Sequence, residues 1–549
     1  MNRLIPKNIY KILLALVILL SLFLRFYKID SNPPSLDWDE ASIGYNAYSI
    51  LKTGADEYGN RLPLSMRSFD DYKPPVYIYL TVPSVAMFGL NEFAVRLPAV
   101  IIGALSIIVV YYLVKEILIN WDNGKKEQIA LLSAFFLAIS PWHLQFSRAA
   151  FEGNVGMFFL ILAVFSFFKA SSDKRFLVLF VISFVLSIYS YHSFRLINPI
   201  ILSLLIALHN KEVIKEKALF LISFAVIVIL SMPIYSGFFI QQGTGARLSM
   251  VTIFSDPEIQ RMSAEKVLEA KLSGDVIGEI IYNRRVVFIP TIVSGYLDHF
   301  NFDFLFLHGD GGVQHHAYNM GMLYLWDFPF VILGLLFLLK KLNKRIITLL
   351  IIFLLAPLPS AITTGTPHPV RAIAMIPVFQ IFAAVGVVFG LQLFKKNKIP
   401  AAFIISILLA LNVGFYLYSY YVLTPIRYGY FWQYGYKEAF AYAKQNEVNF
   451  DKIYVTYEYD QPYIYYLFYN KVDPFWYQKN WNYNGNGSVD RFYRKIGKYE
   501  FKNIDLEKDK KLTKTLIIGS SKEIPDGTPR VIKTVYFPDG KVAFRIVGT

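Results

Sequence analysis

The sequence predicts a polytopic α-helical membrane protein, and three observations lead to this fold class. The chain of 549 residues is 55% hydrophobic, with a mean hydropathy of +0.41. Several apolar runs approach or reach the roughly twenty residues with which a helix spans the hydrocarbon core of a bilayer, among them 12–26, 95–114, 218–235 and 401–421. Lys and Arg gather in alternate short loops between such runs. A soluble protein could not bury so many fully apolar helices.

The positive charge follows the topology of a membrane protein. The formal net charge of +15 would suggest nucleic acid as a partner in a soluble chain. Here the basic residues lie in short loops, which the positive-inside rule places in the cytoplasm: 1–11, 115–127, 169–175, 209–217, 340–345 and 395–398. We therefore expect the partners of the protein to include membrane lipids and no nucleic acid.

Counting the apolar runs, with the basic loops inside, gives about eleven transmembrane helices. The first run is read as a retained helix and not as a signal peptide, because Asp-Ser-Asn-Pro-Pro follows it in place of a small-residue cleavage site. The N-terminus is then cytoplasmic in a multi-pass protein of the plasma membrane. The predicted spans are 10–27, 92–116, 128–144, 153–169, 176–191, 195–209, 217–236, 322–340, 345–362, 370–394 and 400–422.

Three larger pieces lie outside the membrane in this topology. The first outer loop, residues 28–91, contains "DWDE", a helix around residues 40–52 and the run "YKPPVYIYL". The second, 237–321, is polar and mixed in charge. The tail, 425–549, is predicted as a small extracytoplasmic α/β domain, with a helix at 438–445, strands at 452–459, 514–521, 530–537 and 541–548, and a turn at "FPDG". The domain boundaries expected are thus 1–424 and 425–549.

Unusual polar residues gather on the outer side. Charges at membrane depth are costly and usually face a protein interior or a wet cavity, and basic residues here run against the positive-inside trend. The cluster, which joins carboxylates to cations, comprises Asp37, Asp39, Glu40, Lys73, Arg148, Glu152, Arg195, His368 and Arg371. We read it as a site on the outer surface.

Each of these residues also has a purely structural interpretation. Asp39 would cap the helix that follows it, while Asp37 would be a solvated loop residue. Arg148 and Glu152, four residues apart, would form a helical ion pair, and Arg195 would reach toward lipid headgroups. His308, His315, His316 and His368 match no zinc signature, and the absence of cysteine excludes thiolate sites.

The motifs resemble a known family. "DWDEASIGYNA", "YKPPVYIYL" and "FAVRLPAVIIGALSIIVVYYL" are similar to the start of the family 39-type glycosyltransferases, which include protein O-mannosyltransferases and lipid A aminoarabinose transferases and have the membrane GT-C fold. "SPWHLQFSRAAFEGN" resembles the second acidic loop of that family, and "GMLYLWDFPFVILGLL" and "HPVRAIAMIP" resemble its later helix starts. The resemblance covers residues 10–200 and continues in patches to about 395.

The resemblance implies roles for individual residues. Asp39 matches the catalytic carboxylate, with Glu40 as its neighbour, and Lys73 matches the lysine that contacts the lipid phosphate. Glu152 matches a second acidic position that is commonly Asp. Arg148 and Arg371 fall where arginines near the phosphate are expected. Independently of the resemblance, His368 of the outer cluster is also predicted to bind the substrate. No cofactor is required, although the Asp37-x-Asp39 spacing would suit a divalent cation. "WQYGYKE" is similar to an oligosaccharyltransferase signature, but Gln433 replaces its Asp.

These residue types suit sugar transfer from a polyprenyl phosphate to a hydroxyl of a protein, lipid or glycan. A carboxylate takes the acceptor proton and fixed cations stabilise the departing phosphate. Inversion by one displacement needs no acid for the leaving group, so Glu152 would orient the sugar or an arginine. The alternatives are a ligase or polymerase of the O-antigen type, a lipid or polysaccharide transporter, and an inactive scaffold. No duplicated halves support a transporter.

Overall fold

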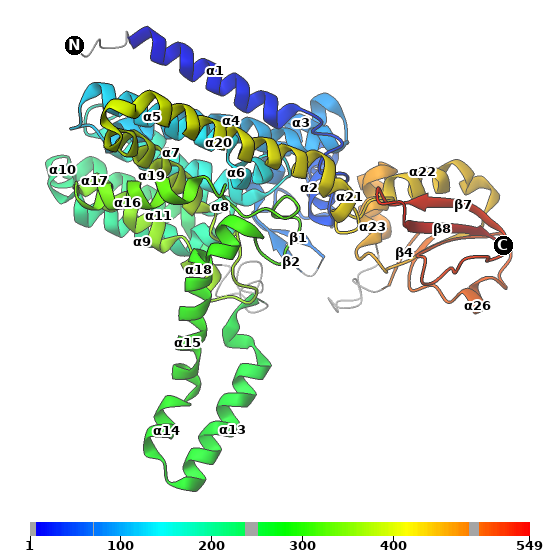
Figure 1. The fold of residues 1–549 in the computed structure, drawn as a ribbon. Helices are drawn as coiled ribbons and strands as arrows, with labels where there is room; N and C mark the ends of the chain where they lie inside the picture. Colours follow the sequence, from blue (N-terminus) through cyan, green and yellow to red (C-terminus); the bar gives the residue numbers. More distant parts are fainter. Residues whose placement is uncertain (1–6, 70, 237–250, 482–492) are drawn as a thin grey trace. The chain divides into compact units, whose positions relative to one another are not determined.

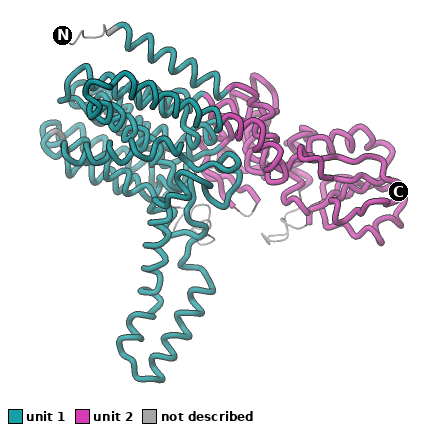
Figure 2. Tube along the Cα trace, viewed as in Figure 1, with its two compact units in different colours: residues 1–25, 101–147, 151–416 teal, residues 26–100, 148–150, 417–549 magenta. Residues whose placement is uncertain are grey.

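The computed structural model describes residues 7–69, 71–236, 251–481 and 493–549. The chain divides into two compact units (Figures 1 and 2). Unit 1 comprises residues 1–25, 101–147 and 151–416, and unit 2 comprises 26–100, 148–150 and 417–549.

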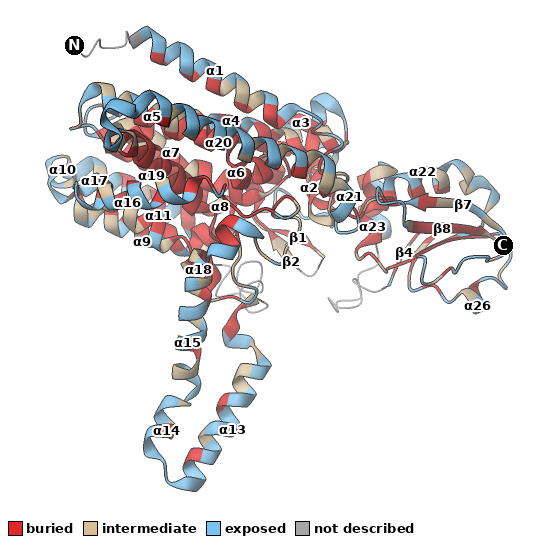
Figure 3. Ribbon diagram, in the orientation of Figure 1, coloured by how far each residue is buried: buried red, intermediate tan, exposed pale blue. Residues whose placement is uncertain are grey.

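Unit 1 is a bundle of apolar helices. Its helices, three of which also extend into unit 2, are α1 (Lys7–Phe26), α4 (Glu92–Ile117), α5 (Asn123–Ile139), α6 (Pro141–Phe146), α7 (Glu152–Ala170), α8 (Phe176–Ser190), α9 (His192–Leu208), α10 (Asn210–Lys215), α11 (Lys217–Ser236), α13 (Pro257–Ser273), α14 (Val276–Ile281), α15 (Arg284–Leu297), α16 (Asp327–Leu339), α17 (Lys344–Leu355), α18 (Leu358–Ala361), α19 (Ile376–Leu393) and α20 (Lys398–Tyr418). Short 3-10 or π turns lie at η1 (Ile253–Ser255), η2 (Asp298–Phe300), η3 (Asp303–Leu307), η4 (Ile373–Met375) and η5 (Lys395–Asn397). The most deeply buried span is α19 (Figure 3).

Every predicted span coincides with a helix. Within the described residues, seven helices are long and apolar enough to cross a membrane, and α3 (Pro75–Phe88), α8, α9 and α16 are shorter apolar helices. Several boundaries differ from the predicted ones, for example the starts of α5, α16 and α19 and the end of α17. Helix α5 begins five residues before the predicted start, because Asp122 accepts a hydrogen bond from the Lys125 N–H and caps it. The α16 and α19 helices begin later than predicted, after irregular turns.

The second outer loop contains helices that the sequence analysis did not predict. Residues 237–250 of this predicted loop lie outside the described residues. The remainder includes a long helical hairpin, α13–α14–α15 (Figure 1). Asp256 caps α13 and Asn283 caps α15, while Gly274 ends α13 with a left-handed backbone at φ 70°. Local capping residues therefore set where these helices begin and end.

Unit 2 begins with the first outer loop. It contains α2 (Trp38–Thr53), the antiparallel strands β1 (Met66–Ser68) and β2 (Asp71–Lys73), and α3. The predicted helix at 40–52 is thus confirmed as α2. "YKPPVYIYL" forms the end of β2 and the start of α3, with Pro75 as the first helical residue, where proline is well tolerated.

The tail forms an α/β structure, as predicted. Its six-stranded sheet has the order β4-β5-β3-β6-β8-β7, with β3 parallel to both β5 and β6. The strands are β3 (Lys452–Val455), β4 (Arg494–Ile496), β5 (Tyr499–Phe501), β6 (Thr515–Gly519), β7 (Val531–Tyr536) and β8 (Val542–Gly548), and the helices and turns are η6 (Ser419–Leu423), α21 (Thr424–Tyr428), α22 (Tyr436–Asn446), η7 (Glu447–Asn449), α23 (Pro462–Tyr469), α24 (Pro474–Asn480) and α26 (Leu506–Asp509). The four predicted strands correspond to β3, β6, β7 and β8; β4 and β5 were missed.

The tail packs against the first outer loop within unit 2. The Tyr465 hydroxyl donates to the Leu36 carbonyl at 3.2 Å, and the Tyr45 hydroxyl donates to the Val472 carbonyl at 3.2 Å. The Gln478 amide donates to Ser49 and Thr53 hydroxyls. The predicted boundary at 424 separates segments that share one compact unit, and the division into domains 1–424 and 425–549 stays a prediction.

Candidate functional site

Helix α2 begins with a capping box. Asp37 is the N-cap, and its carboxylate accepts a hydrogen bond from the Glu40 N–H at 2.7 Å, while the Glu40 carboxylate accepts from the Asp37 N–H. The cap is therefore Asp37, and the interpretations of Asp39 as the cap and of Asp37 as a solvated loop residue were wrong. Burial, with the neighbouring Glu40 and Asp39 carboxylates, raises the pKa of Asp37 well above its usual range.

Glu40 is buried and binds Arg96. The guanidinium donates from Nε to Oε1 at 2.9 Å and from Nη2 to Oε2 at 2.8 Å, and the Ala150 N–H donates to Oε1 at 2.9 Å. Arg96 also donates to the carbonyls of Ile29, Pro33 and Ser35. Both side chains are almost fully buried. The pair fixes the start of α2 to α4 and to the segment after α1.

Asp39 forms an ion pair with Lys73. The distance from Lys73 Nζ to Asp39 Oδ1 is 2.7 Å, and the side chains are 7% and 49% exposed, respectively. Lys73 is the last residue of β2, and Pro74 and Pro75 follow it, so strand and helix N-terminus both restrict its backbone. The Ser42 and Ser68 hydroxyls lie 2.8 Å apart and join α2 to β1. A half-exposed carboxylate thus lies beside a buried ammonium on a rigid frame.

Arg148 is buried in unit 2. Its Nη2 donates to the carbonyls of Tyr27 and Asn32, both at 2.8 Å, and its Nε donates to the Tyr420 hydroxyl at 3.1 Å. The guanidinium also lies over the Tyr420 and Tyr421 rings. Arg148 precedes α7, whose first residue is Glu152, so the two residues do not share a helix and the helical ion-pair interpretation was wrong. Asp37, Asp39, Glu40, Lys73 and Arg148 therefore belong to one compact unit.

The remaining predicted residues belong to unit 1. Glu152 is buried in the first turn of α7, where a carboxylate interacts favourably with the helix dipole. Gly153 lies against Val370, where an added Cβ would meet the Val370 side chain at 2.9 Å. This close approach holds the start of α7 against the segment that carries His368 and Arg371.

His368 and Arg371 lie in the turn between α18 and η4. The His368 N–H donates to His299 Nε2 at 3.0 Å, and the His368 ring lies 5.0 Å from that of His315. Arg371 Nη1 donates to the Thr363 hydroxyl at 2.5 Å and to the Thr364 carbonyl at 2.8 Å. Burial lowers the pKa of Arg371.

Arg195 does not reach outward. It lies in the first turn of α9, is 3% exposed, and lies 2.9 Å from His192 Nδ1. Its backbone carbonyl accepts from the Tyr235 hydroxyl. The interpretation of a side chain extended to lipid headgroups was therefore wrong.

The carboxylates do not form a cation site in this structure. Among the described residues there is no group of three or more His, Cys, Asp or Glu side chains that could hold a metal ion. Asp37 accepts the capping hydrogen bond, and Asp39 is paired with Lys73. These engagements do not fit a divalent cation at Asp37 and Asp39.

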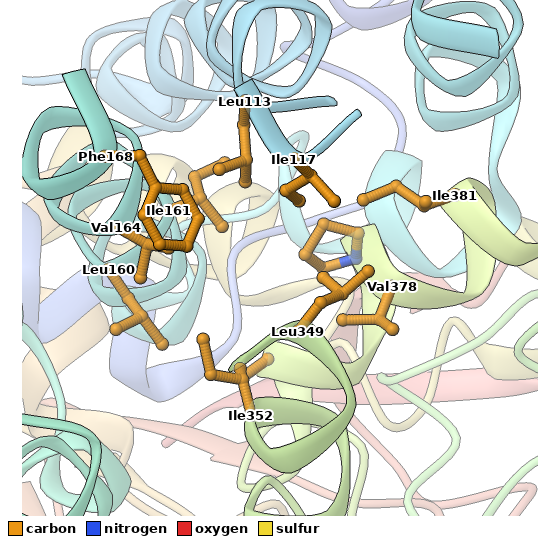
Figure 4. A pocket seen from close by; sticks show the side chains of 12 residues that line it. Leu113, Ile117, Leu160, Ile161, Val164, Phe168, Leu349, Ile352, Val378 and Ile381 are labelled. Carbon is orange, nitrogen blue, oxygen red and sulfur yellow. The ribbon is translucent and has the colours of Figure 1, made fainter. Parts of the chain in front are cut away.

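Unit 1 contains a small cavity. It measures about 20 Å³ and is lined by apolar side chains of α4, α7, α17 and α19, among them Leu113, Leu160, Leu349 and Ile381 (Figure 4). With no polar partner in its lining, it is a packing gap of about one water volume and not a reaction site.

Sequence reasoning missed Arg96. It stands within "FAVRLPAV", which contributed to the resemblance, but the residue itself was not selected. The available signal was a lone cation near the start of an apolar span, which requires a partner. Glu40 is that partner, 56 residues away in the sequence.

Residues 72–236 match the family described as dolichyl-phosphate-mannose-protein mannosyltransferase. ArnT from Cupriavidus metallidurans, in its crystal structure bound to undecaprenyl phosphate, is 13% identical, with 98% of each chain covered and a TM-score of 0.53. The protein has the GT-C fold. The apo crystal structure of ArnT gives a TM-score of 0.51 at 12% identity, with 97% of each chain covered.

One curated relative also matches this GT-C protein. YkcB of Bacillus subtilis (strain 168), a protein assigned as a mannosyltransferase, is 26% identical over 188 residues, which are 33% of this chain and 24% of YkcB. The match thus spans about a quarter of that relative's length. Together, the matches confirm the predicted resemblance and the multi-pass membrane fold.

Proposed function

We propose that this GT-C protein transfers a sugar from a polyprenyl-phosphate donor to an acceptor hydroxyl on the extracytoplasmic side of the plasma membrane. The observation that carries this proposal is the Asp39–Lys73 pair: a half-exposed carboxylate 2.7 Å from a buried ammonium, at the start of α2. Lys73 lies within the segment that matches the mannosyltransferase family. The ArnT structure of similar fold contains undecaprenyl phosphate, which supports a lipid phosphate as the leaving group.

In this mechanism Asp39 is the general base. Its carboxylate takes the proton of the acceptor hydroxyl as the oxygen attacks the anomeric carbon. The bond from that carbon to the phosphate oxygen breaks, and its electron pair leaves with the polyprenyl phosphate. Lys73 stabilises this developing negative charge. A single displacement inverts the anomeric carbon, and no second carboxylic acid is needed because the phosphate is a stable anion.

The other residues have supporting roles in the proposal. Glu40, saturated by Arg96 and Ala150, holds the start of α2 so that Asp39 and Lys73 stay aligned. Arg148 positions the segment after α1 through its bonds to the Tyr27 and Asn32 carbonyls. For Glu152, His368 and Arg371 we retain substrate binding. The acceptor is a protein, lipid or glycan.

The orientation is also part of the proposal. The basic loops between the spans support a cytoplasmic N-terminus, because cytoplasmic loops of membrane proteins are enriched in Lys and Arg. An odd number of spans then places the tail outside, together with α2 and the Asp39–Lys73 pair. Accessibility of a tag on the tail to protease in intact cells tests this orientation independently of activity.

The catalytic assignment is tested in two steps. Mass spectrometry of envelope glycans from a deletion strain identifies the missing sugar. Membranes are then supplied with the corresponding polyprenyl-phosphate sugar, and release of polyprenyl phosphate is measured. Asp39→Asn should lower the transfer rate by about 10²–10⁴-fold or more, because a general base contributes about that much to the rate. Full activity of that variant would eliminate Asp39 as the base.

A further inference from the structure

The hairpin formed by α13, α14 and α15 carries apolar side chains that the protein itself does not cover. At its tip, which we define as Leu272, Val276, Ile277, Ile280 and Ile281, every side chain is more than half exposed, and Leu272 and Ile277 reach 81% and 69%. Figure 3 shows the hairpin as mostly exposed along its length. Soluble surfaces rarely expose a contiguous apolar cluster without a partner.

The two ends of the hairpin, just before α13 and at the end of α15, are hydrogen-bonded to one end of the bundle in unit 1. The Tyr296 hydroxyl donates to the Leu354 carbonyl at 2.9 Å, at the last turn of α17. The Ile253 N–H donates to the Ile362 carbonyl at 3.2 Å. Helix α17 begins at Lys344, in a basic loop. The two ends of the hairpin therefore lie at the end of α17 opposite that loop. This end of α17 lies at a boundary of the bilayer.

The direction of the hairpin follows from the same anchoring. Figure 1 shows α13 and α15 leaving the bundle across the direction of α16 and α17. Because the bundle helices cross the bilayer, a hairpin that leaves their ends sideways runs along the membrane surface. Helix α13, with 17 residues, is about 25 Å long. Its tip is thus carried well beyond the bundle at the level of the headgroups.

The side chains fit an interfacial position. On α15, Ile289, Val293 and Leu297 are spaced four residues apart and form one exposed stripe. Arg284 and Arg285 are exposed where α15 begins, and they line an open recess with Phe254 and Phe288. Guanidinium groups next to apolar residues are typical of helices that lie in the interface and bind lipid phosphates. Charged pairs on α13, such as Arg261 with Glu265, limit the inserted part to the tip and α15.

We propose that residues 257–297 form a membrane-interface hairpin, whose tip and α15 stripe insert into the adjacent leaflet while Arg284 and Arg285 bind lipid phosphates. The occupant of the apolar surface is thus the lipid bilayer. The alternative occupant is a second copy of this chain. The proposal goes beyond the proposed function and would hold for any activity of the protein.

The absence of cysteine makes the test direct. The variant Ile277→Cys in the full chain carries a single thiol, which is labelled with an environment-sensitive fluorophore. The matched control is Val448→Cys, an apolar residue of η7 that is 89% exposed outside the hairpin. Both proteins are placed, at one or at two copies per disc, in nanodiscs of phosphatidylcholine and phosphatidylglycerol, with or without lipids that carry a nitroxide near the headgroup. Size-exclusion chromatography confirms that each variant is folded.

We expect a blue-shifted emission at position 277 and a larger loss of fluorescence with nitroxide lipid there than at 448. Aqueous iodide should quench the fluorophore at 448 more than the one at 277. Equal iodide quenching at both positions, with no effect of nitroxide lipid, would overturn the proposal. A blue shift that requires two copies per disc, without nitroxide quenching, would overturn it in favour of self-association. If adding Arg284→Gln and Arg285→Gln leaves the nitroxide-lipid quenching at position 277 unchanged, the proposed binding of lipid phosphates by the two arginines is refuted.

Discussion

Exchanging Asp39 and Glu40 for their amides should separate catalysis from folding at the start of α2. Both oxygens of Glu40 accept from buried donors: Oε1 from Arg96 and Ala150, and Oε2 from Arg96. An amide at this position must point its NH₂ group at one of those donors. Asp39, in contrast, binds Lys73 and is half exposed, so the amide oxygen of Asn can still accept from the ammonium.

The expected magnitudes follow from this difference. Removing one partner of a buried ion pair costs about 3–5 kcal/mol, and a pair of two exposed side chains contributes about 0–1 kcal/mol. The Asp39–Lys73 pair, with one buried and one half-exposed member, lies between these limits. In a unit of this size, 1 kcal/mol shifts the unfolding temperature by about 2–4 °C. Glu40→Gln should therefore lower the unfolding temperature by about 6–20 °C, and Asp39→Asn should lower it by less.

The assay combines thermal unfolding of detergent-purified protein, followed by size-exclusion chromatography with fluorescence detection, and polyprenyl phosphate release in membranes. Asp39→Asn should be stable and inactive. Glu40→Gln should be unstable, with residual activity in proportion to the folded fraction. The reverse result, a stable and inactive Glu40→Gln beside an active Asp39→Asn, would refute the reasoning and make Glu40 the base.

Three further outcomes are expected. Lys73→Ala should raise the apparent KM for the donor, because the ammonium is assigned to the lipid phosphate; an unchanged donor KM would count against that role. Transfer should survive a chelator such as EDTA, and a loss that Mg²⁺ or Mn²⁺ restores would reinstate a cation at Asp37 and Asp39. Burial raises the pKa of Glu57 to about 8 from 4.5, against the opposing effect of Arg494. Because the folded state then binds this proton more tightly, stability should be lost as the pH rises from about 4.5 toward about 8. Over that window the unfolding temperature of the wild type should fall relative to that of Glu57→Gln, and parallel curves would contradict this sign.

The membrane helices were predictable because lipid demands a simple pattern. A span requires a continuous apolar run and basic loops on one side, and both can be read without knowledge of the partners. The hairpin of α13 and α15 gave no such pattern. Its boundaries depend on Asp256, Gly274 and Asn283, which act within a few residues and leave only a weak mark in a mixed-charge loop. The short strands β4 and β5, three residues each, were likewise too short to predict.

The site illustrates a second limit of the sequence. Asp39 and Lys73 could be selected because each stands in a recognisable motif, and the structure brings them to 2.7 Å. Arg96 stands in an apolar run 56 residues from Glu40, and only the fold reveals that it saturates that carboxylate and three backbone carbonyls. The two carboxylates of the acidic pair in "DWDE", Asp39 and Glu40, therefore differ in burial. The carboxylate that Arg96 saturates has no free oxygen for an acceptor proton, while the half-exposed one beside Lys73 has access to solvent, which is why Asp39 and not Glu40 is assigned as the base.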